Sequence, residues 1–208
     1  MVAPKFSHSS QYWQERYALG GNSGSGSYNR LADFKAEIIN QFVDANEIES
    51  VVEFGVGDGN QLLFGNYPRY LGVDISPVAI ATCRERFHQD TTKSFMTVDE
   101  FCDTPMVFDL SQSLDVIFHL VEDDVFHDYM SRLFAAGSRF VVVYSSNEDR
   151  PTMDSHVRHR QFTKWVQKHQ PTWTLFDHIK NRFPFDAGDP HNTSFADFYF
   201  FKKKAVHE

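Results

Sequence analysis

Alternating glycines and a downstream acid are the residues of this sequence best suited to binding a small ligand. Gly55, Gly57 and Gly59 follow the apolar segment 51–54, and Asp74 ends the next apolar segment, 19 residues after Gly55. Closely spaced glycines between a strand and a helix let the backbone approach a ligand. A carboxylate at about this distance accepts hydrogen bonds from ribose hydroxyls. Together these residues predict a site for a ligand that contains a nucleoside.

The glycine spacing separates two classes of such ligands. A dinucleotide fingerprint, GxGxxG, requires glycine at position 60, where this sequence has Asn60. The sequence instead has Glu53 followed by glycines at 55, 57 and 59, which resembles the first motif of class I S-adenosylmethionine-dependent methyltransferases. The resemblance implies that Glu53 helps to place the amino group of the cofactor. A nicotinamide-dependent oxidoreductase is the alternative that a thermal-shift comparison of ligands would test.

The resemblance continues in order along residues 50–145. Segment 71–76 is similar to the second motif of the family, and Asp99 follows the third expected strand, where the family often has an acid that contacts adenine. Segment 108–120 resembles the fourth-strand motif, which closes the methionine side of the pocket. The cofactor residues implied in this core are Glu53, Gly55, Gly57, Gly59, Asp74, Ile75, Asp99 and Ser113.

A glycine- and serine-rich segment, 20–27, lies between two stretches with helical apolar spacing, 12–19 and 31–42. Such a loop between amphipathic helices favours a lid or binding loop over a flexible tether. The arrangement resembles the N-terminal caps of many methyltransferases of this class. We expect Arg16 and the loop from Ser23 to Ser27, which includes Ser25, to close over the methionine carboxylate of the cofactor.

The reacting end should lie beyond the carboxyl ends of the fourth and fifth strands. Methyl transfer is a displacement at a sulfonium carbon, so the protein aligns the acceptor and removes its proton where necessary. His119 is our candidate base and Asp115 its catalytic neighbour, although a histidine that only shapes the pocket is an open alternative. Asp115 with Asn147 or Asp149 would imitate the magnesium sites of some such enzymes, but the positions register poorly and we expect no metal.

A basic stretch, 150–168, directly follows the fifth expected strand in an otherwise acidic protein. It includes His156, Arg158, His159 and Arg160. Charge runs on helices are commonly solvated faces. Their position here instead favours a pocket for an anionic acceptor, such as a phosphorylated or carboxylated sugar. On this hypothesis, replacing either arginine with alanine raises the Michaelis constant of the acceptor.

Strand and helix patterns alternate in the elements that must position these residues. Strands are expected at 51–54, 70–73, 94–98, 110–114 and 139–144, helices at 61–67, 77–87, 125–134 and 161–169, and a terminal strand pair at 173–179 and 195–201. This order predicts an α/β, Rossmann-like, doubly wound and mostly parallel seven-stranded sheet with a C-terminal antiparallel hairpin and an N-terminal helical cap. We expect one domain, with the cap and its lid in 1–46 and the core in 47–208.

Composition narrows the function. With 20 Lys and Arg against 28 Asp and Glu, the chain has no general field to attract nucleic acid. Cys83 and Cys102 form no CxxC pair and no disulfide framework, and no apolar run approaches a membrane span, so we expect a cytoplasmic protein.

We predict an S-adenosylmethionine-dependent methyltransferase that releases S-adenosylhomocysteine, with O-methylation of a small polar molecule favoured. An N-methyltransferase and a non-catalytic cofactor-binding regulatory module are the alternatives, and the oligomeric state is open.

Overall fold

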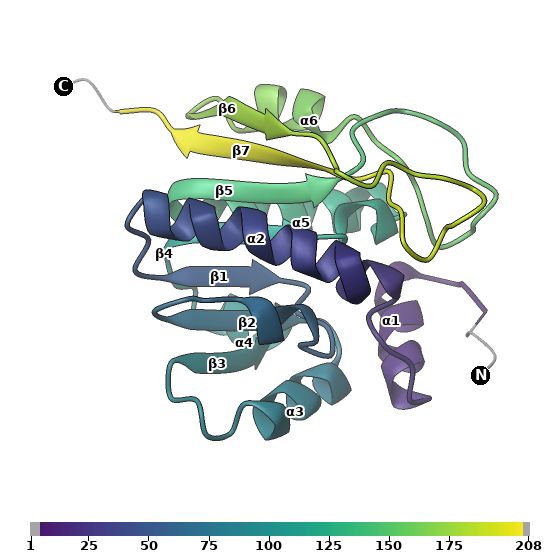
Figure 1. The fold of residues 1–208 in the computed structure, drawn as a ribbon, viewed down its shortest axis with the longest axis horizontal. Helices are drawn as coiled ribbons and strands as arrows, with labels where there is room; N and C mark the ends of the chain where they lie inside the picture. The colour runs from purple at the N-terminus through teal and green to yellow at the C-terminus, as the bar shows by residue number, and fades with distance from the viewer. Residues whose placement is uncertain (1–4, 206–208) are drawn as a thin grey trace.

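A seven-stranded sheet with the order β3-β2-β1-β4-β5-β7-β6 forms the centre of the molecule in a computed structural model, which describes residues 5–205. Strand β7 runs antiparallel to both of its neighbours, and the pairs among β1 to β5 are parallel. Figure 1 shows the parallel strands ending along one edge. The strands are β1 Val51–Phe54, β2 Tyr70–Asp74, β3 Lys93–Thr97, β4 Phe108–Leu114, β5 Gly137–Ser145, β6 Trp173–Ile179 and β7 Asp197–Lys203.

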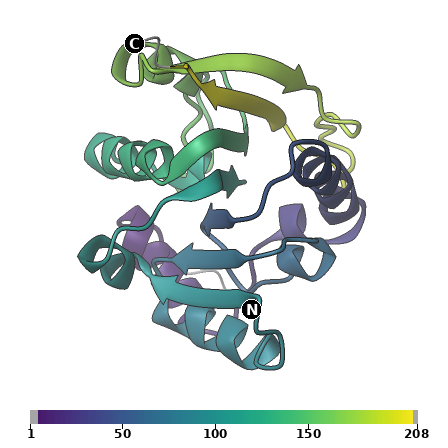
Figure 2. The same ribbon diagram turned by 90° about the vertical axis from the view of Figure 1, so that its left-hand side faces the viewer.

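Helices cover both faces of this sheet, as the end-on view in Figure 2 shows. One core cluster joins the sheet to α4, α5 and α6, and a second joins it to α2 and α3. The α-helices are α1 Ser9–Ala18, α2 Asn29–Ala45, α3 Pro77–Arg86, α4 Val98–Asp103, α5 Asp123–Ala135 and α6 Phe162–His169. Short 3-10 helices are η1 Ser25–Ser27, η2 Gln61–Phe64 and η3 Ile117–His119.

The central strands are rich in apolar residues because they are covered on both sides. Every residue of β1 and β2 is buried, which is typical of parallel strands between two helical layers. Helix α3 begins where the sequence predicts, because Ser76 caps its N-terminus by accepting a hydrogen bond from the Ala79 N–H and Pro77 occupies the first turn. These local signals start α3 three residues after β2 ends at Asp74.

The expected fold is confirmed, including the antiparallel pairing of the last two strands. Strand β7 lies between β5 and β6, so the last strand of the chain is internal and β6 forms the edge. The helix expected at 61–67 is only the short η2. The cap expected at 1–46 and the core expected at 47–208 include residues 1–4 and 206–208, which lie outside the described residues. The assignment of both ranges to a single domain stays a prediction.

The third strand ends earlier than expected. Thr97 and Glu100 form a capping box that starts α4 at Val98, so Asp99 lies in the first turn of a helix and not at a strand end. Its side chain is exposed. The strand expected to reach residue 98 was therefore wrong by one residue, because the helix cap competes with strand continuation.

Candidate active site

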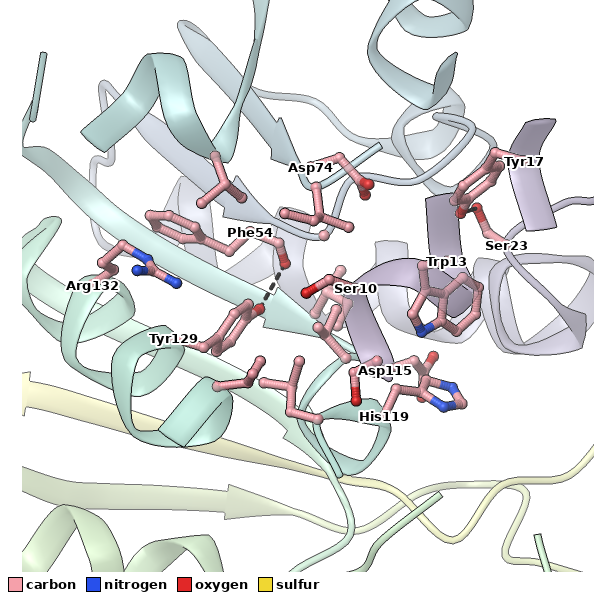
Figure 3. A pocket seen from close by; sticks show the side chains of 18 of the residues that line it. Ser10, Trp13, Tyr17, Ser23, Phe54, Asp74, Asp115, His119, Tyr129 and Arg132 are labelled. Atoms are coloured by element: carbon pink, nitrogen blue, oxygen red, sulfur yellow. Dashed lines mark hydrogen bonds between the residues drawn. The ribbon is translucent and has the colours of Figure 1, made fainter. Parts of the chain in front are cut away.

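A cavity lies at the carboxyl ends of the parallel strands, beneath the N-terminal cap (Figure 3). The strand ends and the cap both contribute walls. Asp74 ends β2, and Gly55 and Asp115 directly follow β1 and β4, while Trp13, Tyr17 and Ser23 come from the cap. Helix α1 lies across the ends of the strands in Figure 1, so the cap covers the edge where ligands bind in open parallel sheets.

The glycine loop is pressed against the cap. Gly57 has φ +60°, and a Cβ there would lie 2.2 Å from Ser23 Oγ and 2.6 Å from the Tyr17 hydroxyl. Neither the backbone conformation nor the space therefore admits a side chain. Burial raises the pKa of Tyr17 well above its ordinary value, so its hydroxyl stays protonated where it meets Ser23 Oγ at 3.0 Å.

Asp58 joins the loop to the glycine- and serine-rich segment. Its Oδ2 accepts from the Ser23 N–H at 3.0 Å and from the Tyr28 hydroxyl at 2.8 Å, while Ser23 Oγ accepts from the Asp58 N–H at 2.9 Å. Burial acts to raise the pKa of Asp58, but these bonds and one from the Asn60 N–H outweigh it and hold the pKa below its ordinary value. Sequence reasoning missed Asp58, although an acid between two loop glycines was a visible signal.

Asp74 faces the cavity from the end of β2. Its Oδ2 accepts from the Gly57 N–H and its Oδ1 from the Ser76 N–H, both at 2.9 Å. Burial raises the pKa of Asp74 to about 6, although the backbone hydrogen bonds oppose the shift. Each carboxylate oxygen has a second lone pair, so Asp74 can still accept hydrogen bonds from two hydroxyls of a ligand.

Glu53 lies behind the cavity and does not line it. Its carboxylate accepts from the Tyr70 hydroxyl at 2.9 Å and from Gln112 Nε2 at 2.8 Å, which ties β1 to β2 and β4. Burial raises the pKa of Glu53 above its ordinary value. The structure therefore gives Glu53 a role in holding the strand ends together, and its expected part in placing a cofactor amino group stays a prediction.

Ser113 is also set back from the cavity. Its Oγ lies 2.6 Å from the Tyr129 hydroxyl, which donates a hydrogen bond to the Phe54 carbonyl at 2.8 Å. Tyr129 itself lines the cavity, as its position in Figure 3 shows. Ser113 acts here through Tyr129, which no sequence pattern singled out.

Some of the residues predicted from sequence line the cavity, and others do not. The lining residues are Gly55, Asp74, Ile75, Asp115 and His119. The remaining cofactor candidates do not line it, namely Arg16, Ser25, Glu53, Gly57, Gly59, Asp99 and Ser113. From the loop expected at Ser23 to Ser27, both end residues line the cavity and Ser25 does not.

Arg16 supports the cap from outside the cavity. Its Nε donates to the Asn22 carbonyl at 2.7 Å, and its guanidinium lies 5.4 Å from the centre of the Trp13 ring. The first contact holds the start of the glycine- and serine-rich segment, and the second packs the guanidinium against the Trp13 indole, which lines the cavity. A direct contact between Arg16 and a bound ligand stays a prediction.

Asp115 is held by a lysine that the sequence analysis did not single out. Lys35 of α2 is fully buried, and its Nζ lies 2.6 Å from Asp115 Oδ2. Asp115 has φ +60°, an uncommon conformation for a residue with a side chain. The signal for Lys35 was its place on the apolar face of the helix, four residues from both Leu31 and Ile39.

His119 lies between cap and core. Its Nδ1 is 3.1 Å from the His156 carbonyl, so Nδ1 carries the proton and Nε2 keeps its lone pair. The ring stacks on His156 at 5.5 Å and meets Trp13 edge-on at 4.9 Å. Desolvation lowers the pKa of His119 to about 3, which makes it a neutral hydrogen-bond acceptor and a weak base.

The basic stretch does not reach the cavity. Arg158 donates to the Val121 carbonyl at 2.8 Å and Arg160 to the same oxygen at 2.7 Å, and both pair with Asp123. His159 Nδ1 lies 2.8 Å from Ser146 Oγ, and His156 stacks on Tyr12 at 5.0 Å. The two arginines thus fasten the segment after β5 to the loop after β4, His159 bonds within its own segment, and His156 packs on α1, so the anion pocket expected from these residues is not part of this cavity.

Two of the candidate magnesium ligands, Asn147 and Asp149, make hydrogen bonds away from the cavity. Asn147 Oδ1 accepts from the Thr163 N–H, and Asp149 Oδ1 accepts from the Gln161 N–H. Across residues 5–205, no group of three or more His, Cys, Asp and Glu side chains is placed to hold a metal ion. Nor does any helix within that range have the length and apolar character needed to span a bilayer.

Comparisons with known proteins place this geometry in a structural class. No family model matches the chain, and no curated protein matches by sequence. The fold is similar to that of the N-methyltransferase NodS from Bradyrhizobium japonicum WM9, with a TM-score of 0.72, 14% identity, and coverage of 95% of this chain and 99% of that one. Magnesium protoporphyrin IX methyltransferase (ChlM) from Synechocystis PCC 6803 gives a TM-score of 0.67 at 10% identity, covering 97% of this chain and 100% of that one. The small RNA methyltransferase HEN1 has a TM-score of 0.63 and 16% identity to this chain, with coverage of 88% of this chain and 26% of that one. The chain therefore has the fold of class I S-adenosylmethionine-dependent methyltransferases.

Proposed function

We propose that this protein binds S-adenosylmethionine and transfers its methyl group to a small polar acceptor. The observation that carries the proposal is Asp74, a buried carboxylate that lines the cavity and is bonded to the glycine loop through the Gly57 N–H. Asp74 would accept hydrogen bonds from both ribose hydroxyls of the cofactor. Apolar side chains suited to an adenine ring line the same cavity, namely Ile75, Val98, Leu114 and Leu120. When bound, the cofactor supplies an activated methyl group.

A dinucleotide cofactor fits these residues less well. Such cofactors place a pyrophosphate at the N-terminus of an α-helix that follows the glycine loop. The glycine loop here is followed by η2, a 3-10 helix of four residues, Gln61–Phe64. This loop therefore offers a diphosphate little helix dipole.

For the acceptor we propose a hydroxyl compound, which makes the reaction an O-methylation. His119 Nε2 would accept the hydrogen bond of the hydroxyl and orient its oxygen. Because burial lowers its pKa to about 3, His119 would orient the hydroxyl without retaining its proton, which would be released to solvent once the oxygen carries the methyl group. The cavity gives no support to the anionic acceptor expected from the basic stretch, since Arg158 and Arg160 are bonded to backbone carbonyls.

Two alternatives predict different behaviour. An N-methyltransferase would keep its activity without His119, because an amine in its neutral form needs no base. A regulatory module would bind the cofactor without turnover. Incubation with methyl-labelled S-adenosylmethionine and a pool of small metabolites separates the module from an enzyme, and the His119→Asn variant separates the two enzymes.

Calorimetry tests the cofactor proposal directly. S-adenosylhomocysteine should bind the wild-type protein and NAD should not. Asp74→Ala should weaken that binding by about 100-fold, as expected for the loss of two hydrogen bonds to a charged group. Binding of NAD alone would refute the proposal.

A further inference from the structure

The buried ion pair between Lys35 and Asp115 has a free side. Asp115 Oδ2 is engaged by Lys35, whereas Oδ1 has no hydrogen-bond partner in the described part of the chain. Asp115 lines the cavity and keeps 16% of its side chain accessible, while Lys35 keeps none. The carboxylate therefore has one oxygen anchored in the protein and one available to a ligand.

The surroundings fix the direction of this carboxylate. Its backbone N–H donates to the Tyr144 carbonyl at 3.0 Å, and the residue keeps a left-handed conformation that commonly marks functional sites. A Cβ on Gly26 would lie 2.7 Å from Asp115 Oδ2, so the glycine- and serine-rich segment closes over the pair. Lys35 Nζ also lies 5.4 Å from the centre of the Tyr144 ring, which holds the ammonium in place.

We propose that Lys35 is a positioning residue that anchors Oδ2 of the Asp115 carboxylate, with Oδ1 directed at the acceptor beside the transferred methyl group. An ionised carboxylate only accepts hydrogen bonds, so the acceptor must present an O–H or N–H at or next to the methylated atom. A carboxylate or phosphate nucleophile is selected against, because its charge would oppose that of Oδ1. This inference rests on the proposed cofactor site and narrows its acceptor class.

Sinefungin provides a probe that requires no knowledge of the acceptor. It resembles S-adenosylhomocysteine but carries an amine where the cofactor has its methyl group. If Oδ1 faces that position, wild-type protein should bind sinefungin at least about tenfold more tightly than S-adenosylhomocysteine, a factor that corresponds to about 1.4 kcal/mol. Calorimetry with each ligand gives the ratio of the two affinities.

Variants test whether the ratio of sinefungin affinity to S-adenosylhomocysteine affinity depends on the ion pair of Lys35 and Asp115. Asp115→Asn should reduce the ratio to about one, since a neutral amide attracts an ammonium weakly. Lys35→Met should also lower the ratio below about threefold, because the carboxylate loses its anchor and can turn away from the ligand. Lys35→Arg, which keeps a cationic partner, should retain most of the wild-type ratio. The matched control is Glu37→Gln, on the same helix as Lys35. It breaks the exposed ion pair between Glu37 and Arg182 and should leave the ratio unchanged.

Each outcome bears on a separate claim. A preserved ratio in Asp115→Asn would overturn the assignment of Oδ1 to the methyl position. A ratio lost in Asp115→Asn but kept in Lys35→Met would overturn the role of Lys35. Absence of S-adenosylhomocysteine binding in the wild type would instead remove the proposed function. If Lys35→Met does not fold, Lys35→Gln takes its place, because its amide keeps a polar partner for the buried carboxylate but removes the charge. A ratio kept in Lys35→Gln would equally overturn the role of Lys35.

Discussion

Replacement of Gly57 with alanine should uncouple the cap from the glycine loop. The left-handed backbone costs about 1–2 kcal/mol for a residue with a Cβ. That Cβ would lie 2.2 Å from Ser23 Oγ, so Ser23 must move and lose its hydrogen bonds with the Asp58 N–H and the Tyr17 hydroxyl. At about 1 kcal/mol for each bond, the total reaches about 3–4 kcal/mol.

Gly59→Ala is the matched control for this prediction. Gly59 has φ +73°, so the backbone cost is similar, but its added Cβ would contact Cys83 and Phe87 of the α3 region, not the cap. Both variants should lower the melting temperature, by about 2–4 °C for each kcal/mol in a chain of this size. Only Gly57→Ala should release the cap.

Two measurements distinguish the variants. Hydrogen exchange at the Ser23 amide, which donates to Asp58, should accelerate in Gly57→Ala and stay slow in Gly59→Ala. Calorimetry should show S-adenosylhomocysteine affinity reduced about 10- to 100-fold in Gly57→Ala and about threefold or less in Gly59→Ala. Equal losses of affinity in the two variants would refute the idea that a docked cap is needed for cofactor binding.

Further predictions concern Asp74, Asp58 and Arg160. Because the pKa of Asp74 is raised to about 6 in the folded protein, its contribution to the stability of the free protein is present below about pH 4 and is lost as pH rises through 6. Its ionised form accepts the ribose hydroxyls, so the affinity for S-adenosylhomocysteine should rise with pH to a plateau above about 7, and Asp74→Asn should flatten the calorimetric profile. Asp58→Ala removes the carboxylate that binds Ser23 and Tyr28, and should accelerate exchange in segment 20–27 and weaken the same ligand about tenfold; a silent variant would contradict the docking role. Arg160→Ala should lower the melting temperature by about 4–8 °C, for a loss of about 2 kcal/mol, because the Arg160 guanidinium bonds to carbonyls and to Asp123. Its cofactor affinity should be unchanged. A stable variant with a raised Michaelis constant for the acceptor would instead support a role for Arg160 in acceptor binding.

The parallel core could be predicted closely because burial on both faces leaves a simple pattern. Strand β1 was expected at 51–54 and is observed at Val51–Phe54, since a strand covered on both sides is rich in apolar residues, and Glu53 is the one charged residue of this strand. The ends of elements were harder to place where two local signals compete. Asp99 was assigned to a strand end because the apolar run reaches residue 98, but the capping box of Thr97 and Glu100 begins a helix there.

The site was less accessible to sequence reasoning because its contacts join distant segments. Arg160 bonds to carbonyls about 40 residues earlier, and nothing in the run of basic residues shows that these oxygens lie beside it. Lys35 gave a local signal, a charge on an apolar helix face, but its partner lies 80 residues away. A charged residue inside a predicted core stripe therefore indicates a buried partner without identifying it.

The alternating glycines are explained by packing as much as by the ligand. A Cβ on Gly57 would overlap Ser23 of the cap, one on Gly59 would overlap side chains of the α3 region, and one on Gly55 would lie 2.3 Å from Val116 Cγ2 beyond β4. Only Gly55 of the three lines the cavity. The spacing thus lets three separate elements approach one short loop. Because the cap is one of these elements and covers the cavity, order in the cap and affinity for the cofactor should change together.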